Sequence, residues 1–87
     1  MSEAFNKAAE DVKVLKSTPS NEELLELYGL FKQATVGDVN TDRPGMFDLK
    51  GKSKWDSWKG REGLSKADAE AKYIETANGL IAKYGKA

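Results

Sequence analysis

Apolar residues recur every three or four positions in four segments of this 87-residue chain, and no segment alternates as a strand does. The clearest segment begins at Ser20, where Glu23 completes a capping-box pattern, and Gly37 stands where such a helix would end. Its apolar stripe consists of Leu24, Leu27, Tyr28, Phe31 and Ala34. The spacing predicts an all-α bundle, with residues 1–87 forming a single domain.

The same signals predict the other three helices. Ser2 can cap a first helix, and Pro19 prevents its continuation. The apolar face of that helix consists of Phe5, Ala8, Val12 and Leu15. A shorter helix is expected over residues 51–59, and a last one opens at Ser65 and ends at Gly85.

Helical periodicity is lost between the second and third helices, over residues 36–49. The stretches at residues 40–42 (NTD) and 44–45 (PG) are typical of turns, so we expect a long ordered loop rather than a strand. A long loop in a small domain often borders a functional site.

Composition excludes several classes of protein. The chain has no cysteine and no histidine, so we expect no disulfide, no metal site and no cofactor. Its 14 basic and 14 acidic residues balance, which argues against nucleic-acid binding. The N-terminal residues lack the apolar region of a signal peptide, and no apolar run approaches the roughly 20 residues that span a bilayer. We expect a cytoplasmic protein without stable membrane insertion.

Two groups of residues could bind a ligand. Tyr28, Phe31 and Lys32 share one helical face and together offer a hydroxyl, an aromatic plane and an ammonium, which can hold a nucleotide. Lys50 and Lys54 form a second basic pair. Spacing alone favours a plainer interpretation for the first group, in which the aromatic rings are core and the lysine lies at its edge.

Other aromatic residues are interpreted as structural, and catalysis is not expected. Trp55 and Trp58 are predicted to pack, whereas a structural hydrogen bond and a ligand contact suit Tyr73 equally well. No Ser-His or Cys-His pair and no glycine-rich phosphate loop occurs. The acidic residues at 22, 23 and 26 suit an exposed first helical turn, so the chain is predicted not to be an enzyme.

Three motifs in order carry a family resemblance: KQATVGD at residues 32–38, RPGM at 43–46 and KWDSW at 54–58. Together they resemble the acyl-CoA-binding protein family, and the resemblance extends over residues 5–84. It implies an up-down-down-up four-helix bundle and a non-catalytic intracellular carrier of long- and medium-chain acyl-CoA. It also implies a monomer that contacts acyl-CoA-using enzymes transiently.

The resemblance further implies a set of ligand contacts. The 3′-phosphate anchors would be Tyr28, Lys32 and Lys54. The adenine contacts would be Ala9, Lys13, Tyr28, Phe31 and Lys32. Lys50 and Tyr73 would also line the ligand, and the acyl chain would be flanked by Leu24, Leu25 and Leu27. Phe31 stands where the family usually has tyrosine, which keeps stacking but removes a hydroxyl, and Arg61 replaces an apolar side chain.

Two other classes remain open. One is a helical protein-interaction module without a small-molecule ligand. The other is a peripheral protein of membrane surfaces, although no predicted helix combines a wide apolar face with a lysine-rich one.

Overall fold

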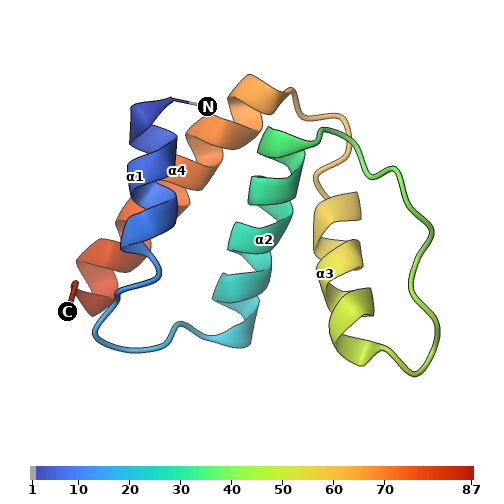
Figure 1. Cartoon of the computed structure of the whole chain (residues 1–87), viewed down its shortest axis with the longest axis horizontal. Helices are drawn as coiled ribbons and strands as arrows, with labels where there is room; N and C mark the ends of the chain where they lie inside the picture. The colour runs from blue at the N-terminus through green and yellow to red at the C-terminus, as the bar shows by residue number, and fades with distance from the viewer. Residues whose placement is uncertain (1) are drawn as a thin grey trace.

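The structure, a computed structural model, describes residues 2–87 and contains four helices in that range. They are α1 (Glu3–Asp11), α2 (Asn21–Thr35), α3 (Leu49–Lys59) and α4 (Lys66–Tyr84). Helices α1 and α4 run in one direction and α2 and α3 in the other (Figure 1). The predicted all-α bundle with up-down-down-up topology is confirmed.

Helix α2 lies at the centre of the molecule. It packs against α4 on one side and α3 on the other, and α1 packs on α4 (Figure 1). The buried core is shared by α1, α2 and α4, and its residues are Phe5, Ala8, Leu27, Leu30, Ala34, Ala69, Tyr73, Ala77 and Leu80. Helix α3 therefore stands outside the main core, against α2, and the seam between these two helices is open to a ligand.

Side-chain caps set the start of every described helix. The hydroxyls of Ser2, Ser20 and Ser65 accept hydrogen bonds from the backbone N–H three residues on, at 3.2, 3.2 and 3.0 Å. These three caps are confirmed as predicted, including the capping box of α2. Asp48 caps α3 by accepting from the backbone N–H of Gly51 at 2.9 Å. The third helix therefore begins two residues earlier than expected.

The predicted extent of the first helix is wrong. Helix α1 ends at Asp11, so Leu15 lies beyond it and forms an isolated bridge with Lys86. The backbone N–H of Lys16 donates to the Gly85 carbonyl at 2.9 Å, so residues 15–16 pair with the end of the chain. Leu15 still packs against the core, through this pairing rather than as part of a helical stripe.

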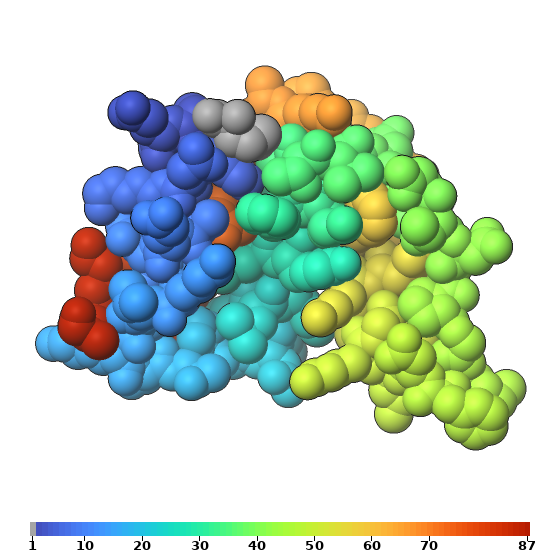
Figure 2. Space-filling model, in the orientation of Figure 1, coloured from blue at the N-terminus to red at the C-terminus, as the bar shows by residue number. Residues whose placement is uncertain are grey.

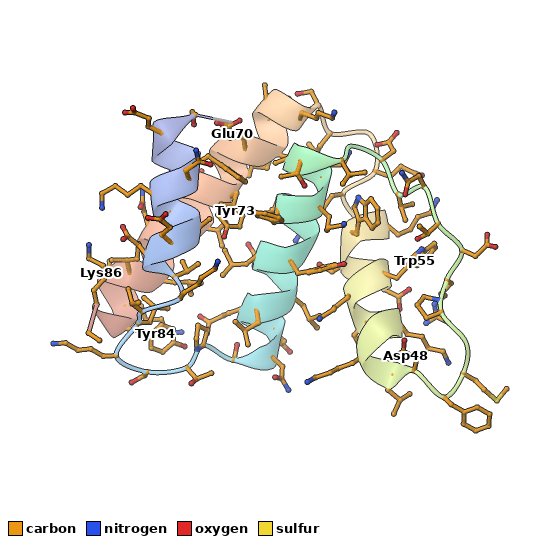
Figure 3. All side chains as sticks on the ribbon, in the orientation of Figure 1. Asp48, Trp55, Glu70, Tyr73, Tyr84 and Lys86 are labelled. Atoms are coloured by element: carbon orange, nitrogen blue, oxygen red, sulfur yellow. The ribbon has the colours of Figure 1, made fainter. Side chains whose placement is uncertain are left out.

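The loop between α2 and α3 is tied to α3 by both tryptophans. The Trp58 indole N–H donates to the Gly37 carbonyl at 2.7 Å, and the Trp55 indole N–H donates to the Thr41 carbonyl at 2.9 Å. Trp58 is buried. Trp55 is half-buried and lies on the side of α3 that faces the loop (Figure 3). Both rings therefore have the structural role that was predicted for them.

Candidate ligand-binding groove

A pocket of about 510 Å³ lies between α2 and α3. Figure 2 shows an opening here, between the side chains of α2 and those at the start of α3. Its lining residues are Asn21, Leu24, Leu25, Tyr28, Leu49, Lys50, Ser53 and Lys54. The volume is in the range of small-molecule sites. We call this pocket the α2–α3 groove.

A close contact between the two helices sets where the groove ends. A Cβ atom on Gly29 would lie 2.4 Å from the Ser57 hydroxyl and 2.6 Å from the Ser57 carbonyl oxygen. The Ser57 hydroxyl donates to the backbone carbonyl of Leu25. The helices thus touch at Gly29 and Ser57, and the groove occupies the seam on the N-terminal side of this contact.

Leucine side chains on both walls make one part of the groove apolar. Leu24 on α2 is 42% exposed and Leu49 on α3 is 72% exposed, while Leu25 is half-buried. Large apolar side chains on facing walls leave apolar surface in contact with water, which a hydrocarbon chain would cover.

Tyr28, Lys50 and Lys54 make the other part of the groove polar, and Lys32 lies beyond the groove lining, one turn along α2 from Tyr28. The Lys54 Nζ lies 5.4 Å from the centroid of the Tyr28 ring, and the Lys32 Nζ lies 4.9 Å from the centroid of the Trp58 ring. Neither ammonium forms a salt bridge with a carboxylate in residues 2–87. Aromatic faces therefore position two cations whose charge is free to meet an anion.

Next to these cations, Phe31 offers a ring that is buried on one side only. It stacks on Phe5 with centroids 5.6 Å apart and meets the edge of Tyr73 at 5.9 Å, yet remains 38% exposed. Tyr73 lies in the core between α1 and α2 (Figure 3), and burial raises the pKa of its phenol. The free face of Phe31 can stack on a planar base.

Five of the eleven predicted contact residues line the groove, namely Leu24, Leu25, Tyr28, Lys50 and Lys54. The other six, Ala9, Lys13, Leu27, Phe31, Lys32 and Tyr73, lie outside its lining. Leu27 is a core residue with 6% exposure, so its side chain belongs to the bundle interior. Ala9 is half-buried on α1, and Lys13 follows that helix on the surface. A second pocket of about 200 Å³ includes Lys13 and shares Leu24 with the groove, so a ligand in the groove could reach α1 around this leucine.

Sequence reasoning missed Asn21, Leu49 and Ser53 as lining residues. The signal for two of them was present, since Ser53 lies four residues after Leu49 and three after Lys50, and residues at these spacings share one side of a helix. These two residues were not predicted as lining residues because α3 was expected to begin only at residue 51, which left Leu49 outside the helix.

Comparisons with known proteins agree with this geometry. The family model described as "Acyl CoA binding protein" matches residues 2–77. The chain belongs to the acyl-CoA-binding protein family. A relative from Caenorhabditis elegans, acyl-CoA-binding protein homolog 1, is 59% identical over 85 residues, which cover 98% of this chain and 99% of that protein.

Solved structures of the acyl-CoA-binding protein family share the fold. The crystal structure of Oryza sativa acyl-CoA-binding protein 2 superposes with a TM-score of 0.89 at 53% identity, covering 93% of this chain and 88% of that one. The crystal structure of an ACBP from Moniliophthora perniciosa gives a TM-score of 0.86 at 48% identity, covering 95% and 83%. The family is one of binding proteins, in agreement with the prediction that the chain is not an enzyme.

The described residues bear on two other expectations for this acyl-CoA-binding family member. Among residues 2–87 no helix is both long and apolar enough to cross a bilayer. The same range holds no group of three or more acidic side chains placed to bind a metal ion.

Proposed function

We propose that this chain, as a single domain over residues 1–87, binds long- and medium-chain acyl-CoA thioesters and buffers them as a carrier without transforming them. The observation that carries the proposal is the α2–α3 groove. It joins exposed leucines to Lys50 and Lys54, which form no salt bridge within residues 2–87, in a member of the acyl-CoA-binding protein family. Lys32, which also forms no salt bridge in that range, lies one turn beyond Tyr28 on α2.

The polar part of the groove would hold the CoA head group. Lys54 and the Tyr28 hydroxyl, which line the groove, would donate to the 3′-phosphate together with Lys32, one turn further along α2. Lys50 lines the groove one turn before Lys54 on α3. Hydrogen bonds to a charged group contribute roughly 1.5–3 kcal/mol each. Adenine would stack on the free face of Phe31, with α1 on its other side.

The apolar part would cover the hydrocarbon chain. Leu24, Leu25 and Leu49 would contact it from both walls of the groove. Each methylene removed from water contributes roughly 0.8 kcal/mol, so a long chain can add more than the head group does. Free CoA would gain only the first contribution and a free fatty acid only the second, so tight binding requires both parts of one ligand.

We further propose a location, an oligomeric state and partners for the protein. It would work in the cytoplasm as a monomer and pass acyl-CoA to the enzymes that use it. Support comes from the balanced charge of the chain and from its family.

Calorimetric titration of the chain with palmitoyl-CoA, CoA and palmitate tests the proposal. Palmitoyl-CoA should bind far more tightly than either fragment. Equal affinities for palmitoyl-CoA and CoA would contradict the two-part site. Absence of binding by all three would favour a helical protein-interaction module instead.

A further inference from the structure

A tight turn at the start of α3 holds apolar side chains in the solvent. The backbone N–H of Asp48 donates to the Gly45 carbonyl at 3.0 Å, which makes Met46 and Phe47 the two central residues of the turn. Phe47 is 95% exposed, Met46 69% and Leu49 72%. Such central positions usually carry small or polar residues, so the turn itself does not call for these side chains. We name Met46, Phe47 and Leu49 the apolar tip.

The apolar tip projects from the body of the protein. Figure 2 shows the yellow-green surface of residues 45–49 as a protrusion at the lower right, and Figure 3 places Asp48 at the base of α3 beside it. A Cβ built on Gly45 meets no atom within 4 Å. Convex apolar side chains of this kind can insert into a fluid apolar medium, such as the acyl-chain region of a bilayer, which needs no preformed cavity to receive them.

Three lysines follow the apolar tip along α3. Residues 45–55 carry one acidic side chain and three basic ones, which are Lys50, Lys52 and Lys54. The acidic one, Asp48, is engaged in capping α3. The next carboxylate on α3, Asp56, is held by two hydrogen bonds of 2.9 Å from Arg43. The lysines form no salt bridge within residues 2–87, so the tip region favours an anionic surface.

The tip is also continuous with the ligand groove. Leu49 belongs to both, and Lys50 lines the groove one residue further on. The groove reaches Asn21 at the start of α2 and Leu49 at the start of α3, so it extends to the end of the molecule at which the tip lies (Figure 1). A hydrocarbon chain that leaves the groove past Leu24 and Leu49 emerges beside the apolar tip.

We propose that the apolar tip docks the protein on anionic lipid bilayers, so that an acyl chain can pass between the bilayer and the α2–α3 groove. This inference rests on the proposed function, because it assigns the surface from which the same groove is loaded. Docking is shallow and reversible: Met46 and Phe47 enter the interface while the lysines meet lipid head groups. A protein partner and a second copy of this chain are the other candidate occupants of the tip.

Co-sedimentation with vesicles tests the docking. Wild-type protein, Phe47→Ser and Val14→Ser are compared on phosphatidylcholine vesicles with and without phosphatidylserine. Val14 is a matched control, since it is apolar and 50% exposed but lies outside the tip. We expect wild type and Val14→Ser to prefer the anionic vesicles equally. Phe47→Ser should partition about tenfold more weakly, because burial of one aromatic ring contributes on this order.

Two further measurements distinguish failure of the membrane docking from failure of the proposed function and from dimerisation through the tip. Palmitoyl-CoA titrated in solution should bind all three proteins equally, because Phe47 does not line the groove. Failure of wild type to bind palmitoyl-CoA would overturn the proposed function. Normal binding by wild type without Phe47-dependent vesicle association would overturn only the docking. Sedimentation velocity without lipid should show monomers, and a dimer lost in Phe47→Ser would assign the tip to a second copy instead.

Discussion

Lys32→Ala offers the sharpest test of the head-group site, because the Lys32 ammonium meets an aromatic face and no carboxylate of residues 2–87. Removing it should cost about 1.5–3 kcal/mol of palmitoyl-CoA binding, a ten- to hundredfold loss. The folded protein loses only a cation–π contact with Trp58, worth about 0.5–1 kcal/mol near the surface. Such a change lowers the melting temperature by a few degrees, roughly 4–8 °C per kcal/mol.

The assay is a calorimetric cycle with two ligands, palmitoyl-CoA and its 3′-dephospho analogue, and two proteins. If the Lys32 ammonium contacts the 3′-phosphate, Lys32→Ala should lose affinity for palmitoyl-CoA but little affinity for the 3′-dephospho analogue. The variant should still prefer palmitoyl-CoA, by a smaller factor than wild type does, because Tyr28 and Lys54 remain. Lys72→Ala is the control, since Lys72 is exposed on α4 outside the groove. Lys32→Ala that binds palmitoyl-CoA normally but melts early would refute the assignment, as would an equal loss for both ligands.

Three further predictions concern stability and the shape of the groove. Trp58→Ala should lower the free energy of unfolding in urea by about 3–5 kcal/mol, because the ring is buried. Gly29→Ala should weaken palmitoyl-CoA binding in calorimetry by forcing α3 off α2, whereas Gly79→Ala, with open space around it, should stabilise α4 by about 1 kcal/mol and leave affinity unchanged. The Tyr84 hydroxyl, foremost among several donors, lowers the Glu23 pKa from 4.5 to about 2. The resulting stability is full above pH 4.5 and lost toward pH 2. Melting temperatures across this window should therefore fall more for wild type than for Glu23→Gln.

Each of these predictions has an opposing result. A Trp58→Ala protein as stable as wild type would show that the indole does not hold the loop to α3. Unchanged affinity in Gly29→Ala would separate the groove from the helix contact. If the melting temperatures of wild type and Glu23→Gln fell in parallel between pH 4.5 and 2, ionised Glu23 would not contribute to stability in this range.

The sequence predicted those parts of the fold that local chemistry decides. The serine caps of α1, α2 and α4 and the glycine at the end of α4 were recognised, because a cap involves residues a few positions apart. The end of α1 was not, because Leu15 leaves the helical pattern to pair with Lys86, far along the chain. No local window contains both residues.

The site was predicted in part for a similar reason. Spacing brought Tyr28 and Lys32 together on α2, but the contacts of Tyr28 with Lys54 and of Lys32 with Trp58 depend on how α3 packs. Leu27 was expected at the acyl chain and lies in the core, because a broad apolar stripe does not reveal which of its edges faces solvent. No role was predicted for Gln33, yet its buried side-chain amide donates to the Asp38 carboxylate and to the Leu64 carbonyl, both at 2.8 Å.

Intermolecular nuclear Overhauser effects between bound palmitoyl-CoA and the isotope-labelled protein test the central claim most directly. The α2–α3 groove predicts contacts from the acyl methylenes to the methyl groups of Leu24, Leu25 and Leu49. It also predicts contacts from the adenine protons to the Phe31 ring, whose free face is exposed. Acyl contacts confined to methyl groups outside the groove, such as those of Ile81 on α4, would contradict it.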